Sequence, residues 1–185
     1  MVVLRRTRKL SALLPESGVA AATSDTALGD WYVNRIVVDR QPLLLLISSA
    51  TLLPILIPAR DVRHLPDRLA QIVEARLQRC GVEAAVIKAE VDAMASVAVG
   101  ATVDRSVLGI LVDFAKCVPF HLEPGQWDEG MLPAVEACLA ETPCYASGPD
   151  ERVIFPERKA PQALMSKWLA NMPLQPASGT WAGVH

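Results

Sequence analysis

A cluster of polar and aromatic side chains near residue 30 is the first place where this sequence could do chemistry. A strand that begins at Trp31 would place Tyr32 and Asn34 on one face and Trp31 on the other. With Asp30 before the strand and Arg40 after it, these groups could hold a base, a sugar or a carboxylate through directed hydrogen bonds. In the structural alternative, Asp30 caps a turn, Trp31 is core and Arg40 forms an exposed salt bridge.

A second polar cluster precedes a strongly apolar run near residue 105. If a helix begins at Arg105, its free N–H groups and the guanidinium could bind an anionic group, with Ser106 adding a hydroxyl. Asp113 follows on the same segment. In the competing interpretation, Asp104 and Ser106 cap the helix, Gly109 lets it pack closely against a sheet and Arg105 pairs with an Asp.

No catalytic signature accompanies these clusters. The sequence has no nucleophile elbow, phosphate-binding loop, dinucleotide glycine fingerprint or zinc-protease motif. The three histidines are isolated, and the four cysteines form no C-x-x-C pair, which favours packed thiols over a metal site. We therefore expect no cofactor and no bound metal.

Two further segments each allow a structural and a functional interpretation. Residues 162–169 (QALMSKWL) resemble the short peptide by which partners dock on sliding clamps, although an amphipathic helix that packs Leu164 and Trp168 explains the same pattern. The basic start from Arg5 to Lys9 could contact phosphate locally or form a solvated strand edge.

The elements that must position these residues alternate between short strands and helices. Strand patterns occupy residues 2–7, 31–38, 97–99 and 153–155, and helix patterns occupy residues 8–14, 65–79, 83–94, 105–118 and 132–140. Gly81 is placed to end the helix before it, and the segment 105–118 is apolar on most sides, which predicts a central helix. Residues 15–26 and 143–161 are expected to be mostly irregular, and the last ten residues to fray.

The uncharged segment 41–59 is close to the length of a membrane span. Three prolines and a polar break at 48–51 divide it, however, and this pattern predicts two short buried strands. With 51% hydrophobic residues and a net charge of −2, the chain is core-rich and has no field that would gather nucleic acid over its whole surface.

These patterns together predict an α+β fold. We expect a small, mainly antiparallel sheet, made of the N-terminal strand plus a meander, that is covered by helices. Residues 1–160 would form a single domain, followed at 161–185 by a C-terminal helix and a frayed tail.

Over about residues 1–120 the chain resembles a bacterial family of unknown function, DUF6933. The resemblance rests on GDWYxN at 29–34 and RSVLG at 105–109, with Thr51-Leu52-Leu53-Pro54 and Asp113-Phe114 in support. It implies a bacterial protein but no reaction. Such proteins tend to have Asn where this chain has Asp104, which places a negative charge beside any anion that Arg105 would hold.

The expected function is that of a non-catalytic binding or regulatory protein, acting through a protein interface as a homo-oligomer or with a protein partner. The apolar run from Leu10 to Leu14 is too short for a signal peptide, so a cytoplasmic location without a membrane span is expected. The alternative is a small enzyme acting on nucleic acid or a nucleotide, with both polar clusters in one pocket. Contact with nucleic acid is not favoured.

Overall fold

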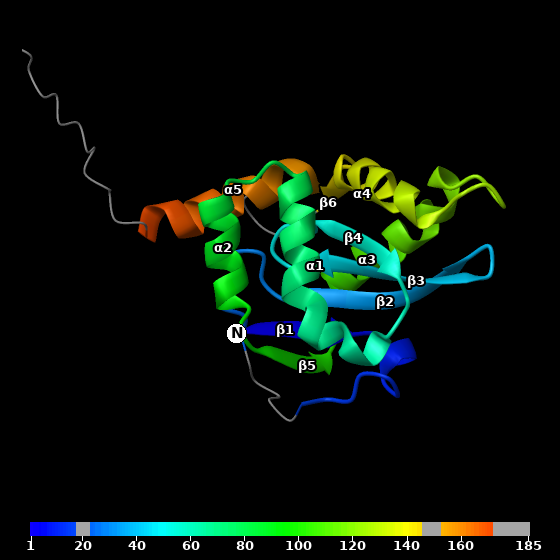
Figure 1. Cartoon of the computed structure of the whole chain (residues 1–185), viewed down its shortest axis with the longest axis horizontal. Coiled ribbons are helices and arrows are strands. Elements are labelled where there is room, and N and C mark those ends of the chain that lie inside the picture. Colours follow the sequence, from blue (N-terminus) through cyan, green and yellow to red (C-terminus); the bar gives the residue numbers. More distant parts are fainter. Residues whose placement is uncertain (18–22, 146–152, 172–185) are drawn as a thin grey trace, which may run out of the picture.

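The computed structural model describes residues 1–17, 23–145 and 153–171. The expected frayed tail lies outside these residues, and so do parts of the two segments, 15–26 and 143–161, that are expected to be irregular. The described residues form a mixed α+β structure, which confirms the fold class (Figure 1).

A five-stranded sheet forms the centre of the fold, in the order β4-β3-β2-β1-β5. Its strands are β1 (Val2–Arg6), β2 (Trp31–Val38), β3 (Gln41–Ser48), β4 (Pro54–Pro58) and β5 (Val97–Ala101). β2, β3 and β4 form the predicted antiparallel meander. β1 is parallel to both of its neighbours, β2 and β5, so the prediction of a mainly antiparallel sheet is wrong.

The long connections explain why the sheet is mixed. Parallel neighbours need a crossover that brings the chain back to the same end of the sheet, whereas antiparallel neighbours need only a tight turn. The segment between β1 and β2 returns the chain to the start of β1, and two helices carry it from β4 to β5. A strand pattern in the sequence does not indicate whether two distant strands pair parallel or antiparallel.

Helices cover both faces of the sheet, as Figure 1 shows. α1 (Leu65–Arg79) and α2 (Ala84–Ala93) lie on one face, and α3 (Arg105–Cys117) lies on the other. α4 (Leu132–Ala140) packs along β4, and α5 (Pro156–Trp168) contacts α2 and α4. The sequence predicts α1 to α4 to within about two residues, and Gly81 follows α1 with a φ of 69° as expected.

Short elements complete the structure. The predicted helix at 8–14 is reduced to the 3-10 turn η1 (Arg8–Leu10), which is followed by turns in which the backbone N–H groups of Leu13 and Leu14 donate to the Leu10 carbonyl. The predicted domain boundary at 160 falls inside α5, which begins at Pro156 and packs on the domain. The remaining elements are η2 (Val62–His64), η3 (Val118–His121), η4 (Glu129–Met131), η5 (Leu169–Asn171), β6 (Cys144–Tyr145) and β7 (Val153–Ile154).

Two hydrophobic cores lie on opposite faces of the sheet. Side chains of β2 alternate between them as predicted: Trp31 and Val33 enter the core under α1 and α2, and Tyr32 enters the core under α3. β3 and β4 are buried over most of their length, which confirms two buried strands within residues 41–59. Among the described residues, no helix combines the length and the apolar character that crossing a membrane requires.

α3 is amphipathic and not central. Val107, Leu111 and Phe114 face the sheet, whereas Val112 is exposed. A helix that packs on a sheet from one side has an opposite side that nothing in the layer covers. The prediction of a central apolar helix at 105–118 therefore needs correction, and the free side of α3 becomes a feature of the surface.

Candidate functional site

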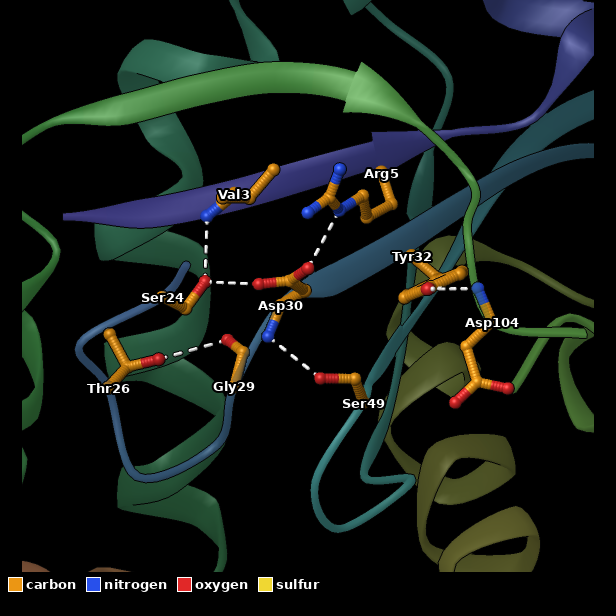
Figure 2. A network of polar contacts seen from close by, with 9 residues as sticks. All are labelled: Val3, Arg5, Ser24, Thr26, Gly29, Asp30, Tyr32, Ser49 and Asp104. Atoms are coloured by element: carbon orange, nitrogen blue, oxygen red, sulfur yellow. Dashed lines mark hydrogen bonds and ion pairs between the residues drawn. The ribbon is translucent and has the colours of Figure 1, made fainter. Parts of the chain in front are cut away.

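The carboxylate of Asp30 is fixed by groups from two other segments. One oxygen accepts a hydrogen bond from Arg5 Nε at 2.7 Å, and the other accepts one from Ser24 Oγ at 2.5 Å (Figure 2). Ser24 Oγ in turn accepts from the backbone N–H of Val3 at 2.9 Å. Asp30 thus ties the loop before β2 to β1. The first cluster therefore has a structural role. Its partners, Arg5 on β1 and Ser24 in the loop, cannot be identified from the sequence.

Gly29 allows this loop to lie against the β3–β4 turn. Its φ is 73°, and a Cβ at this position would lie 2.4 Å from Ser49 Oγ. Ser49 Oγ accepts a hydrogen bond from the backbone N–H of Asp30 at 2.8 Å, and the backbone N–H of Ser49 donates to the Asp30 carbonyl at 2.7 Å. The Gly-Asp pair is therefore explained by backbone packing.

The two polar clusters of the sequence meet on one face of the sheet, the face covered by α3. The buried Tyr32 hydroxyl accepts a hydrogen bond from the backbone N–H of Asp104 at 2.9 Å, as Figure 2 shows. On the same face, Thr7 Oγ1 donates to Asn34 Oδ1 at 3.0 Å. These contacts join β1, β2 and the start of α3, so they position α3 on the sheet.

Asp104 occupies the place at the start of α3 where an anion could bind. Its carboxylate accepts hydrogen bonds from the backbone N–H groups of Ser106, at 2.7 Å, and Val107, at 3.3 Å, and from the Ser106 hydroxyl at 2.6 Å. An external anion would have to compete with this internal carboxylate for the same donors. The capping interpretation explains the site, and Arg105 stays exposed beside it.

Because of this cap, the free energy of unfolding should vary with pH in the acidic range. Hydrogen bonding from the Ser106 side chain is the largest influence that holds the pKa of Asp104 below its ordinary value. Since the folded pKa lies below the unfolded value of about 3.9, the contribution of the cap is complete above that value and is lost as the pH falls through the folded pKa.

We expect Asp104→Ala to lower the free energy of unfolding by about 1 kcal/mol at neutral pH, and by much less in strong acid. Asp104→Asn is the matched control, because the amide oxygen keeps the cap without a titratable group. Urea unfolding across the acidic range measures both variants. An equal loss for Asp104→Ala at neutral and strongly acidic pH would contradict the carboxylate cap.

The structure does not bring all the predicted site residues into one pocket. Asp30 and Arg40 flank the eight residues of β2, which at about 3.3 Å per residue places them about 26 Å apart. Asp39 and Arg40 form the tight turn to β3, with φ values of 47° and 65°. Asp113 lies on the exposed side of α3 and accepts from Lys116 Nζ at 2.9 Å. The single pocket of the enzyme alternative is therefore not formed.

Trp31 does not form the aromatic platform that the first cluster could supply. Its side chain is fully buried under α1 and α2, on the face of the sheet opposite Tyr32 and Asn34. Asp30, Asn34, Arg105 and Ser106 lie on the other side of the sheet from the Trp31 ring, where β1, β2 and the start of α3 meet.

The outward side of α3 has an unusual composition. Gly109 is exposed near the middle of the helix, and a Cβ built on it would have no neighbour within 4 Å. Glycine within a helix costs about 0.5–1 kcal/mol relative to alanine, and the predicted reason for it, close packing on the sheet, is wrong. Large apolar side chains are exposed on this helix and at both of its ends: Val103 (68%), Val112 (40%) and Phe120 (89%).

A comparison with protein families decides where the chain belongs. Residues 3–159 match the family described as Domain of unknown function (DUF6933). The chain belongs to the DUF6933 family. No curated protein and no solved structure matches it. The match confirms the resemblance seen in the sequence, and it extends through β5, α3 and α4 into α5 of this DUF6933 domain.

The DUF6933 domain also buries two carboxylates that the sequence interpretation misses. Glu90 on α2 accepts hydrogen bonds from the backbone N–H groups of Ala27 (2.8 Å) and Leu28 (3.0 Å) and from Trp168 Nε1 (2.7 Å). It therefore joins α2, the loop before β2 and α5. Leu164 is buried and the half-buried Trp168 packs against the core, as the helix interpretation of residues 162–169 predicts.

Glu136 on α4 is the second buried carboxylate. It accepts from the backbone N–H of Leu56 on edge strand β4 at 2.8 Å, and from Arg79 at 2.6 Å. Arg76 Nε lies 3.5 Å from Glu136 and donates to the Pro54 carbonyl at 3.1 Å. These side chains cover the outer edge of β4, where an unpaired strand would otherwise be open to association.

The cysteines and the basic N-terminal residues of this DUF6933 domain do not form a site either, within the residues that the structure describes. Burial raises the pKa of the Cys144 thiol to about 11, as expected for a packed cysteine, whereas Cys138 is exposed. In the basic start, Arg5 pairs with Asp30 and Arg6 with Glu16. Within the described ranges, no three His, Cys, Asp or Glu side chains gather closely enough to hold a metal ion.

Proposed function

We propose that this DUF6933 protein is a non-catalytic binding protein of the bacterial cytoplasm that acts through a protein interface. The interface is the α3 surface, defined as the outward side of α3 together with Val103 before it and Phe120 after it. The observation that carries the proposal is the exposure of Val112 on this helix and of Val103 and Phe120 beyond its two ends, around a glycine that no internal contact explains.

The chemistry of the two polar clusters supports binding over catalysis. Asp30 is engaged by Arg5 and Ser24, and Asp104 by the first turn of α3. A general acid or base must reach a reacting group, and a carboxylate that already serves as a cap or a strap is poorly placed to do so. The contacts of Asp30 hold the loop before β2 on β1, and the hydrogen bond from the Asp104 backbone N–H to the Tyr32 hydroxyl holds the start of α3 on the sheet, with its free side outward.

A protein partner also fits the α3 surface better than nucleic acid does. Isolated apolar residues on a surface need no explanation, but Val112 on α3 with Val103 before the helix and Phe120 after it makes three along one segment, and aromatic side chains such as Phe are enriched at interfaces. The α3 surface carries both charge signs, with Arg105 and Lys116 against Asp113, and the chain as a whole has a net charge of −2. A phosphate backbone would require an excess of positive charge.

The test measures the assembly state in cells that express the protein, by native electrophoresis of the unfractionated lysate. We expect the wild type to migrate in an assembly heavier than the chain, and Val112→Asp and Phe120→Asp to shift it to the mass of the chain alone. Val37→Asp is the control, because Val37 is equally apolar and 58% exposed but lies on β2. Unchanged migration of both α3 variants would contradict the proposal.

A further inference from the structure

On the exposed side of α3, opposite charges are placed symmetrically about a central glycine. On a helix of 3.6 residues per turn, Arg105, Gly109, Val112, Asp113 and Lys116 share one side, opposite the buried Val107, Leu111 and Phe114. Gly109 lies at the centre of this side. A positive charge stands four residues before it and a negative charge stands four residues after it.

We infer that the occupant of the α3 surface is a second copy of this chain. The two α3 helices would cross antiparallel, with Gly109 at the two-fold axis. In such an arrangement a residue four positions before the axis faces the residue four positions after it on the other copy, so Arg105 meets Asp113 of the second copy twice. The inference rests on the proposed function and names its partner.

The charges available on α3 support this arrangement. Arg105 is exposed and forms no ion pair with any residue that the structure describes, so it can pair across an interface. Among the residues that the structure describes, Asp113 pairs with the exposed Lys116 alone, and this pairing contributes little and can be shared. A helix with like charges at these two positions would instead repel its own copy.

The small side chains explain how two helices could approach. The distance between packed helices is set by the side chains at the contact, and glycine at the crossing point allows the closest approach. Val112, three positions after Gly109, would face Ser106, three positions before it, so that a large side chain meets a small one. Val103 and Phe120 extend the contact beyond both ends of the helix.

The experiment uses the purified full chain in sedimentation velocity, from low to high micromolar concentration. We expect the wild type to be a dimer that dissociates on dilution. Arg105→Asp and Asp113→Arg should each weaken the dimer at least about tenfold, because each places like charges together twice. An equal mixture of these two variants should restore it, since every contact then joins opposite charges. Circular dichroism verifies that each variant is folded.

Gly109→Ala provides an independent readout. It should raise the melting temperature at low concentration, where the chain is monomeric, and weaken the dimer about tenfold by adding a methyl group at the crossing point. A wild type that stays monomeric, a dimer that the charge variants leave intact, or a mixture that does not reassociate would overturn the self-pairing. None of these outcomes affects the assembly in cells, so a heterologous partner on α3 would still be found there.

Discussion

Replacing Glu136 with alanine is expected to lower the free energy of unfolding by about 3–5 kcal/mol. Glu136 is 1% exposed and Arg76 is 5% exposed. Water therefore solvates neither charge, and each is stabilised by opposite charge beside it. The substitution leaves the Arg76 guanidinium buried without a carboxylate and removes the acceptor for the Leu56 N–H on β4. Urea unfolding measures the loss.

Glu129→Ala is the matched control for this change. Glu129 also pairs with an arginine, Arg60, but both side chains are exposed to water. The control should change the free energy of unfolding by no more than about 1 kcal/mol, because water replaces the lost partner. If Glu136→Ala and Glu129→Ala cost the same, the buried network along β4 does not contribute as its geometry indicates.

Glu90→Ala is expected to lower the free energy of unfolding by about 2–4 kcal/mol. Glu90 is fully buried and accepts three hydrogen bonds, and its removal leaves the buried N–H of Leu28 without an acceptor. The loss should be local in origin. Amide exchange should accelerate at residues 27–28 and along α5 before it does so in β3.

Trp168→Phe distinguishes the contribution of α5 to this contact from that of the loop before β2. It removes the indole N–H that donates to Glu90 but leaves the bonds from Ala27 and Leu28 intact. A smaller loss of about 1–2 kcal/mol is expected, with faster exchange in α5 alone. Equal exchange in α5 for the wild type and for Glu90→Ala would show that Glu90 does not hold this helix.

The local elements of the fold could be predicted because their patterns are local. The apolar positions of α1 recur at three and four residues, and Gly81 follows at the C-terminus with the left-handed backbone that favours glycine. Asp104 as the cap of α3 was one of two interpretations that its sequence allows, and the distances from Ser106 and Val107 decide for it.

Contacts between distant segments could not be predicted in the same way. Nothing near β1 indicates that it runs parallel to β2 and β5, and nothing near Asp30 identifies Arg5 or Ser24 as its partners. The buried carboxylates did leave a signal. Glu90 and Glu136 each lie three or four residues from buried apolar positions, on the inward sides of α2 and α4.

The candidate site is a structural junction. Asp30 and Asn34, which the sequence offers as ligand-binding residues, and Asp104, which it offers as a cap, hold segments of the fold together. Gly109, which the sequence suggests as a packing glycine against the sheet, faces outward instead. The polar contacts therefore position α3 on the sheet, and α3 exposes its outward side to solvent.

Site-specific photo-cross-linking tests most directly whether the α3 surface is the interface. A photoreactive phenylalanine analogue would replace Phe120, with the same analogue at Met165 on α5 as the control, since Met165 is also apolar and exposed. We expect a discrete cross-linked protein product at 120 and none at 165, with a mass of two chains if the partner is a second copy. Equal labelling at both positions, or none at 120, would contradict an interface on α3.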